Sequence, residues 1–447
     1  MEQSINDFTT GNIRAALIRF SLPFFLTNLI QSLYNIADIM VVGRFCGSDG
    51  IAGASIGGSV TTTITYMIIG LCNGGAIMTA QYAGRKSEAD IKETIGTTFT
   101  LMLLLSAVST VLTLLLTDRI ITALNTPAEA YLQTKAYFRI CMSGSVFIFG
   151  YNAAASILRG LGDSKTPMYF GVASCVLNIG LDLLLVGVFG TGVAGAALAT
   201  VISQAASLIG CVIYLKRRNF IFDFSLRAFR LIPGKAAAVL RLGLPGAVQN
   251  MIVSGGFLIV SSITNSLGVF AVSGVAVAAK INNLAQMPAG AIGMAVSSMV
   301  GQNVGAGNFD RARSTMKNGI MISLIIGAAA FVTVQLFPLR LLSLLVEDAN
   351  VLEQGLKYLR ITSFDYLLVA FVFPLNGLCN GSGHTLFTMI PSVFSSVIAR
   401  VPVAVLCARV LDMGIAGVAI STPTGTISAI IICAIYYFSN KWCEKIL

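Results

Sequence analysis

Charged residues are scarce in this chain, and their scarcity indicates its class. Only 11% of its 447 residues are charged, whereas 55% are hydrophobic and the mean hydropathy is +0.83. Soluble domains usually carry about 25% charged residues, so this composition excludes an ordinary soluble protein. Apolar runs of about 18 residues or more recur along the whole sequence, which predicts an all-α polytopic membrane protein. The net charge of +10 then indicates basic cytoplasmic loops rather than a nucleic-acid partner.

The sequence also lacks the residues of common catalytic and cofactor sites. It has one histidine, and its nine cysteines form no CxxC pair. It contains no HExxH and no GxxxxGK followed by Ser or Thr. Those motifs are typical of zinc proteases and of nucleotide-binding loops. We therefore expect that the protein is not an enzyme, that it has no cofactor apart from a coupling ion, and that it does not use ATP.

What the sequence does contain is apolar segments in two sets of six. A basic linker separates the sets and is predicted to lie along the cytoplasmic surface, so the expected parts are an N-terminal lobe (1–215), a linker (216–237) and a C-terminal lobe (238–447). If the N-terminus is cytoplasmic, 19 of the 29 Lys and Arg residues lie in cytoplasmic segments, which predicts that both termini are inside. The twelve predicted spans are 15–43, 51–79, 94–117, 135–158, 167–187, 192–215, 238–266, 272–300, 317–338, 358–380, 388–408 and 414–438.

The two halves of the chain repeat each other. RFSLP at 19–23 matches RLGLP at 241–245, and GVAGAALAT at 192–200 matches GIAGVAIST at 414–422, both with a shift of 222 residues. The six spans of each half therefore have the same orientation. Parallel repeats of this kind predict two six-helix lobes related by a pseudo-twofold axis along the membrane normal, with a substrate site near their interface.

Two acidic residues inside predicted spans are the most informative charges. Asp38 and Asp182 both lie in the N-terminal half, and each has apolar neighbours along the chain. A carboxylate inside a span costs roughly 3 kcal/mol on insertion scales and usually faces a cavity. In the C-terminal half, Val260 stands at the position of Asp38, and Val403 or Ala404 at that of Asp182. The scaffold therefore does not require the acids, which favours a working role in one lobe.

These features together resemble the multidrug and toxic compound extrusion (MATE) family. The resemblance covers essentially the whole chain. Each of its motifs is a weak signal alone, but their order and spacing together are specific. The motifs are Pro23 and Asp38 in the first helix, AQYAG at 80–84, RGLGDSKTPM at 159–168, Asn178-x-x-x-Asp182, and GVAGAALAT at 192–200. One branch of the family has an acid in its seventh helix. No acid occurs between Arg241 and Ser266, so we expect the DinF-like branch.

The resemblance implies a secondary active multidrug antiporter in a bacterial plasma membrane, acting as a monomer. It would exchange organic, cationic and amphipathic compounds for H⁺ or Na⁺. By this resemblance Asp38, Asn178, Asp182 and Thr200 surround one cation or proton site. Carboxylate, amide and hydroxyl oxygens suit a hard cation such as Na⁺, and the same carboxylates out of water suit protons. Pro23, which removes a backbone donor, is the expected hinge of the first helix.

Less charged groups within the spans are the candidates for holding the substrate. Methionine and aromatic surfaces adapt to ligands of many shapes, although most such residues in a membrane bundle only pack or face lipid. The candidates are Gln31, Tyr34, Asn35, Tyr66, Met67, Tyr151, Asn152, Gln249, Asn282, Asn283, Met287 and the acid Asp365.

A lipid-linked precursor flippase of related architecture is the alternative function. Its cavity would need several Arg and Lys residues to hold a pyrophosphate. Only Lys280 and Arg400 lie well inside predicted spans, which favours the antiporter.

Overall fold

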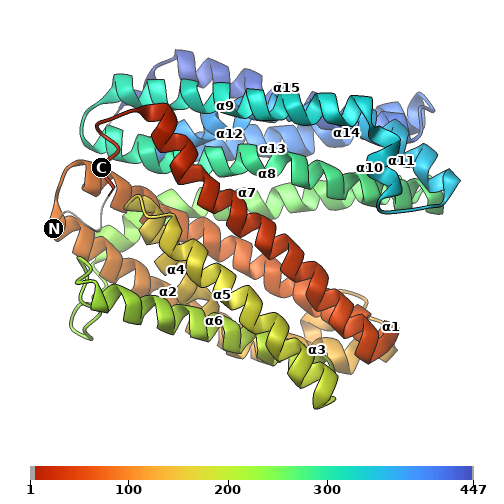
Figure 1. Ribbon diagram of the computed structural model, residues 1–447, viewed down its shortest axis with the longest axis horizontal. Coiled ribbons are helices and arrows are strands. Elements are labelled where there is room, and N and C mark those ends of the chain that lie inside the picture. The colour runs from red at the N-terminus through yellow and green to blue at the C-terminus, as the bar shows by residue number, and fades with distance from the viewer. Residues whose placement is uncertain (1–5, 445–447) are drawn as a thin grey trace. The chain divides into compact units, whose positions relative to one another are not determined.

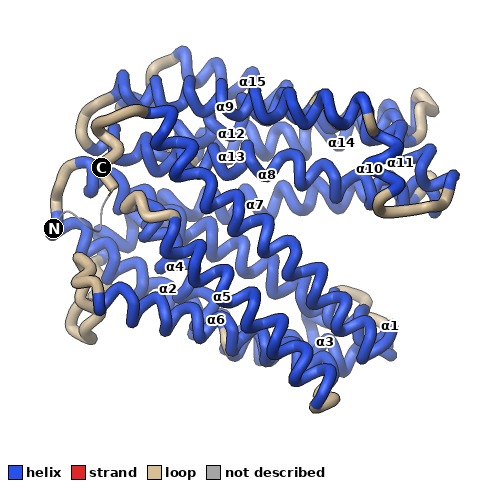
Figure 2. The backbone as a smooth tube through the Cα atoms, viewed as in Figure 1, coloured by secondary structure: helices blue, strands red, loops and turns tan. Residues whose placement is uncertain are grey.

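The computed structural model describes residues 6–444, and every regular element in that range is helical (Figure 2). The first half of the chain comprises α1 (Ile13–Gly84), α2 (Glu88–Ala123), α3 (Ala128–Ser143), α4 (Ser145–Gly160), α5 (Lys165–Asp182), the π-helical segment η1 (Leu183–Val188) and α6 (Gly192–Arg217). The second half comprises α7 (Pro233–Asn265), α8 (Val269–Gly305), α9 (Phe309–Leu336), α10 (Pro338–Ser343), α11 (Ala349–Thr362), α12 (Asp365–Ser382), α13 (Leu386–Val393), η2 (Phe394–Ala399), α14 (Arg400–Val405), η3 (Leu406–Val410), α15 (Ile415–Phe438) and the short η4 (Lys441–Cys443).

The number of membrane spans agrees with the twelve predicted from the sequence. Nine described helical stretches are long and apolar enough to cross a membrane, and two bent pairs, α3 with α4 and α11 with α12, each make one more. The bends measure 52° and 47°. α1 has 72 residues, about twice the length of one span, and it is interrupted at Gly47, whose φ of 68° and ψ of −164° are not helical. It therefore supplies the first two spans.

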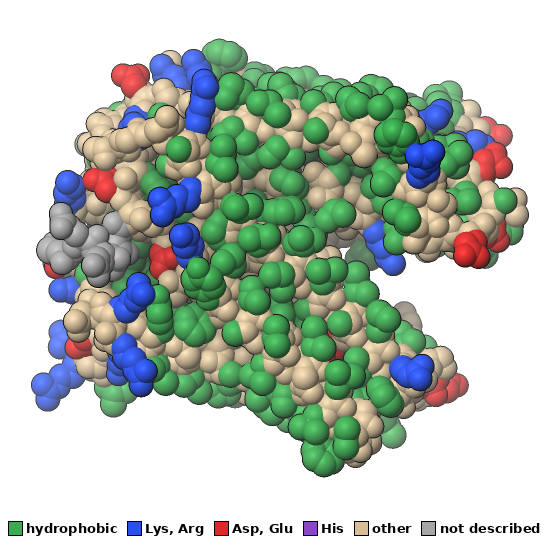
Figure 3. Space-filling model, in the orientation of Figure 1, with side chains coloured by type: hydrophobic (Ala, Val, Ile, Leu, Met, Phe, Trp, Pro, Cys, Tyr) green, Lys and Arg blue, Asp and Glu red, His purple; other side chains and the backbone are tan. Residues whose placement is uncertain are grey.

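Side chains on the outer faces of the helices suit a lipid environment. Large apolar residues are exposed along α2, where Leu115 is 76% exposed. On the face shown in Figure 3, charged side chains lie near the ends of the helices and hydrophobic side chains cover the stretches between them. This distribution is typical of helices whose middle faces hydrocarbon and whose ends face water.

The described chain forms two compact units, and neither is one continuous stretch of sequence. The first unit contains Asn6 and Leu26–Ala247, and the second contains Asp7–Phe25 and the residues from Val248 onward. The chain therefore changes unit within α1, two residues after Pro23, and within α7, two residues after Pro245. The predicted domain boundaries follow the linker, whereas the compact units divide inside these two helices.

Packing within each unit explains why the division falls there. The start of α1 is the red end of the ribbon in Figure 1. In the second unit, its Leu17 and Phe20 belong to a buried cluster with Ala295 and Met299 of α8. In the first unit, α7 begins by packing closely against the second half of α1. A methyl group placed on Gly74 would lie 2.2 Å from the carbonyl oxygen of Val239. Small residues at such crossings allow two membrane helices to approach closely.

The linker, residues 218–232 between α6 and α7, is packed against α2 in the first unit. Its Phe222 and Phe224 are 2% and 8% exposed, and their ring centroids lie 6.4 Å and 5.9 Å from that of Phe99. Thr97 donates its hydroxyl to the carbonyl of Arg230 at 3.1 Å. The apolar linker residues that gave the sequence its amphipathic pattern thus cover a helix.

Gly96→Val is expected to release this linker from α2. A Cβ atom at Gly96 would lie 2.3 Å from the carbonyl oxygen of Ala228, a backbone atom that cannot rotate away. Overpacking of this kind costs about 1–3 kcal/mol. Trypsin should therefore cleave the linker faster at Arg227 and Arg230, as followed by intact mass. Gly234→Val, which meets nothing within 4 Å, is the control, and equal cleavage of the two variants would contradict the prediction.

Candidate functional site

The two acids predicted from the sequence meet in the first unit. Asp38 lies on α1 and Asp182 is the last residue of α5, and their carboxyl groups lie close enough together to interact. Asp182 is fully buried, and Asp38 is half-buried. The Oδ1 atom of each is buried without a hydrogen-bond partner among the described residues. The pair is therefore close together, removed from solvent and able to accept further hydrogen bonds or an ion.

Asn178 and Thr200 complete the predicted set around Asp182. Asn178 lies one turn before Asp182 on α5 and is 1% exposed. In the amide orientation that satisfies both its groups, it donates to Asp182 Oδ2 at 2.9 Å and accepts from the backbone N–H of Thr200 at 3.1 Å. Thr200, on α6, donates its hydroxyl to the carbonyl of Ala196 at 3.1 Å. α5 and α6 thereby position two oxygen-bearing side chains beside the acidic pair.

α1 contributes a second residue one turn before Asp38. The hydroxyl of Tyr34 lies 3.4 Å from Thr200 Oγ1. Because Tyr34 and Asp38 are four residues apart, they share one face of the helix, and both line the same cavity. α1, α5 and α6 therefore all contribute to the site.

The backbone around Asp182 is irregular. α5 ends at Asp182, and the π-helical segment η1 follows immediately. A π-helix bonds each carbonyl to a donor five residues on, so it inserts an extra residue and changes which side chains face inward. Segments of this kind are rare and occur frequently at functional sites.

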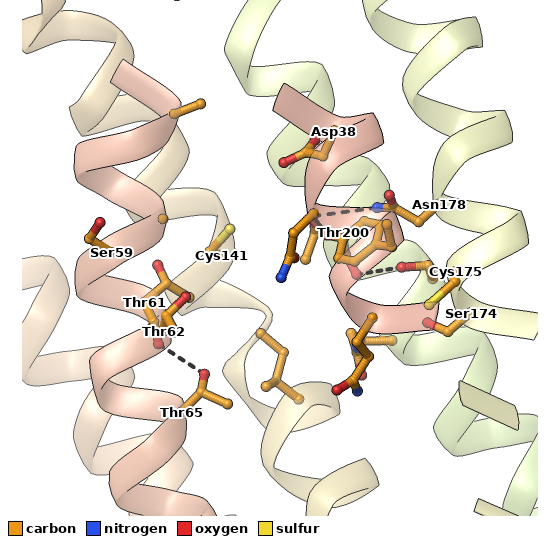
Figure 4. Close-up of a pocket in the computed structure, with 18 of the residues that line it drawn as sticks. Asp38, Ser59, Thr61, Thr62, Thr65, Cys141, Ser174, Cys175, Asn178 and Thr200 are labelled. Atoms are coloured by element: carbon orange, nitrogen blue, oxygen red, sulfur yellow. Dashed lines mark hydrogen bonds between the residues drawn. The ribbon is translucent and has the colours of Figure 1, made fainter. Parts of the chain in front are cut away.

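A cavity of about 650 Å³ opens beside the acids within the first unit. In Figure 4, Asp38, Asn178 and Thr200 lie together on one side, and Ser59, Thr61, Thr62 and Thr65 lie on the other. Pockets that bind small organic ligands usually have volumes of about 300–1,000 Å³. Asp38 is the one charged side chain among the described residues that line this cavity.

The predicted substrate residues fall into two groups. Six line the cavity of the first unit: Gln31, Tyr34, Asn35, Tyr66, Tyr151 and Asn152. Met67 lies in the same unit but is not among the residues lining this cavity. The other five lie in the second unit: Gln249, Asn282, Asn283, Met287 and Asp365.

Several candidates of the second unit have polar partners there. Gln249 donates to Ser392 Oγ at 2.8 Å, and Asn282 donates to Thr362 Oγ1 at 3.0 Å. Asp365 accepts a hydrogen bond of 3.2 Å from Gln286. These contacts give the side chains structural partners, and their assignment to substrate stays a prediction.

Sequence reasoning missed the hydroxyl-bearing wall of the cavity. Ser55, Ser59, Thr61, Thr62 and Thr65 all come from the second half of α1. The run of Ser and Thr from 59 to 65 was a visible signal, because hydroxyls are recurrent hydrogen-bonding groups between membrane helices. The other polar or sulfur-bearing residues that line the cavity and were not predicted are Tyr137, Cys141, Ser174, Cys175, Ser203 and Gln204.

A tightly bound structural metal has no ligand set in the part of the chain that the structure describes. No group of three or more His, Cys, Asp or Glu side chains is found there. The predicted ion set instead combines two carboxylates with an amide and a hydroxyl. These donors suit an exchangeable hard cation or a proton.

The hinge assigned to Pro23 stays a prediction, because α1 continues as a helix through that residue.

Comparisons with known proteins agree with this architecture. A family model described as MatE matches the chain twice, over residues 23–184 and 245–406. The probable multidrug resistance protein YoeA of Bacillus subtilis (strain 168) is 32% identical over 434 residues, which cover 95% of this chain and 93% of the relative. The probable multidrug resistance protein NorM of Thermotoga maritima is 27% identical over 442 residues, covering 97% and 94%.

Solved structures share the fold. An outward-facing multidrug resistance transporter of the MATE family superposes with a TM-score of 0.92 at 24% identity, covering 98% of both chains. A MATE structure in the straight conformation gives 0.89 at 24% identity, covering 97% of this chain and 96% of the other. The DinF-like branch stays a prediction. Because the family model matches both halves and the relatives align over nearly the whole length, the chain belongs to the MATE family of multidrug efflux transporters.

Proposed function

We propose that the protein is a secondary active antiporter that exports organic cations in exchange for H⁺ or Na⁺. The observation that carries the proposal is the close approach of the Asp38 and Asp182 carboxyl groups at the wall of the cavity. Two ionised carboxylates only accept hydrogen bonds and repel each other, so a proton on one of them would stabilise the pair. A bound Na⁺ could replace that proton, because either one offsets the repulsion between two buried negative charges.

The cavity supports an amphipathic, positively charged substrate. Asp38 supplies negative charge, and Tyr34, Tyr66 and Tyr137 supply aromatic surface. A cation over an aromatic face gains about 0.5–2 kcal/mol, the larger values when it is desolvated. Relatives are named multidrug resistance or multidrug export proteins, which supports transport of more than one compound.

Ion binding would be coupled to export through the charge of the acidic pair. Uptake of an ion from outside neutralises the pair and weakens the attraction between Asp38 and a bound organic cation. The substrate then leaves outward, α1 rearranges at Pro23, and the protein returns to its inward-facing form. A membrane potential supplies about 2.3 kcal/mol per charge per 100 mV, so a gradient suffices as the energy source.

The cavity does not favour the flippase alternative. No Lys or Arg occurs among the described residues that line it, and a pyrophosphate would need such groups.

We place the protein in a bacterial plasma membrane with both termini in the cytoplasm, as the distribution of basic residues predicts.

Imposing the two gradients separately on proteoliposomes tests the function and identifies the ion. Ethidium transport should follow either a pH gradient or a Na⁺ gradient, and an ionophore that dissipates that gradient should abolish it. Protein-free liposomes are the control. Transport that persists with neither gradient but requires ATP, or preferential binding of a polyprenyl pyrophosphate over ethidium, would contradict the proposal.

A further inference from the structure

The internal repeat places Arg400 at the position of Asn178. The two matches to the family model, 23–184 and 245–406, differ by 222 residues at both ends, which pairs Asn178 with Arg400. The repeated segments at 192–200 and 414–422 have the same shift and pair Thr200 with Thr422. The contact between Asn178 and Thr200 in the first unit is repeated between Arg400 and Thr422 in the second. The amide of Asn178 lies 3.4 Å from Thr200 Oγ1, and Arg400 Nη2 donates to Thr422 Oγ1 at 2.9 Å. The second unit therefore contains a structural counterpart of the ion site.

The acids of the first unit have no counterpart at this second position. With the same shift, Val260 replaces Asp38 and Ala404 replaces Asp182. Both are buried, at 5% and 0% exposure, and both belong to one hydrophobic cluster. The space that holds two carboxyl groups in the first unit is thus apolar in the second.

A single acid from another helix provides the negative charge instead. Asp365, at the start of α12, is 3% exposed and interacts electrostatically with Arg400. No direct ion pair is formed, and Asp365 Oδ1 and Arg400 Nε are both buried without a hydrogen-bond partner among the described residues. Gln286 donates to the other carboxyl oxygen of Asp365. The guanidinium also lies over the ring of Phe257, 4.4 Å from its centroid.

We propose that the Arg400 guanidinium is a permanently bound cation that closes the counterpart site to exchangeable ions. Arg400 lies near the middle of the 25-residue span Leu386–Val410, where a free charge is unfavourable. Because the guanidinium is covalently attached to the chain, it cannot leave during a transport cycle as Na⁺ or H⁺ can. Its charge balances Asp365, and the ion that drives transport binds only to the pair in the first unit.

This inference rests on the proposed function for the statement that the exchanging ion binds to Asp38 and Asp182. The effect of replacing Arg400 on ion binding at Asp365 does not depend on the proposed function. A buried carboxylate that loses its counter-charge must take up another cation, because leaving it ionised and unpaired in an apolar environment is strongly unfavourable. Arg400→Asn restores at this position the residue found in the first unit and removes the fixed charge. It should therefore create an additional site for Na⁺ or H⁺ at Asp365.

Equilibrium binding of radioactive sodium, with proton uptake on acidification measured in parallel, tests the inference on purified full-length protein. Arg400→Asn should bind one more ion per molecule than the wild type, and Arg400→Asn combined with Asp365→Asn should lose that ion. Arg400→Lys, which keeps a positive charge, should bind the wild-type number. Arg409→Asn is the matched control, since Arg409 is exposed and donates to Ser266 Oγ at 3.2 Å. Arg400→Gln provides a second neutral variant if the asparagine variant does not fold.

The outcomes separate this inference from the proposed function. No additional ion in either neutral variant, or loss of a wild-type ion in Asp365→Asn, would overturn the role of Arg400. Wild-type ion binding that survives the double substitution of Asp38 and Asp182 by Asn would instead overturn the assignment of the coupling site. In that case the comparison between Arg400→Asn and its Asp365→Asn double variant still decides whether the guanidinium closes the second site.

Discussion

Asp38→Asn and Asp182→Asn are each expected to abolish gradient-driven ethidium efflux while the protein remains folded in the membrane. Asparagine has nearly the shape of aspartate, but it neither takes up a proton near neutral pH nor offers a negative charge to Na⁺. Either substitution therefore removes the ionisable pair on which coupling depends. The initial transport rate in proteoliposomes should fall to that of protein-free liposomes.

The two variants should differ in substrate binding. Asp38 lines the cavity, whereas Asp182 is buried behind it and is not among the lining residues. Asp38→Asn should weaken ethidium binding to purified protein, because it removes the charge that faces the cation. Asp182→Asn should retain more of that binding, since Asp182 does not face the cavity and Asp38, which does, is kept in this variant.

Asp412→Asn is the matched control for both variants. Asp412 is exposed and has a φ of 51°, a backbone conformation that asparagine tolerates well. Its transport rate should equal that of the wild type. Wild-type efflux in either Asp38→Asn or Asp182→Asn, at equal protein content, would refute the coupling role of the pair.

Gly74→Val is expected to lower the thermal stability of the first unit substantially. Its Cβ would lie 2.2 Å from the carbonyl oxygen of Val239 and 2.9 Å from the backbone nitrogen of Gly243, so α1 and α7 would have to separate. Overpacking a tight contact costs about 1–3 kcal/mol, and here the obstructing atoms are backbone. The apparent melting temperature in detergent, followed by the fraction that stays monodisperse after heating, should decrease by several degrees.

Gly255→Val is the control for this substitution. Gly255 lies within α7, and a Cβ atom there would meet nothing within 4 Å. The change from glycine to valine alters helix propensity equally at both sites, so the difference between the variants reports the crossing alone. Equal melting temperatures would show that α1 and α7 do not pack as closely as Gly74 and Val239 indicate.

The sequence predicted much of the candidate site because buried charge is a local signal. Asp38 and Asp182 are conspicuous in apolar segments, and the spacing of Asn178 and Asp182 places both on one helix face. The hydroxyl-rich wall formed by Thr61, Thr62 and Thr65 was missed. Threonine and serine are common in membrane helices, so their pattern does not reveal whether they face a cavity, a neighbouring helix or lipid.

The sequence by itself determined that this is a membrane protein with twelve helical spans, a repeat at a shift of 221–222 residues, and a pair of acids, Asp38 and Asp182, whose repeat positions in the other half are apolar. Hydropathy is a property of each segment, and a repeat is found by comparing the sequence with itself, so both are visible in the sequence alone. Only the tertiary structure decided which distant groups meet. It joined Asp38 to Asp182, paired Arg400 with Thr422, and divided α1 and α7 between the two compact units. Those outcomes depend on how helices pack side by side, and residues far apart in the chain carry no local record of that packing.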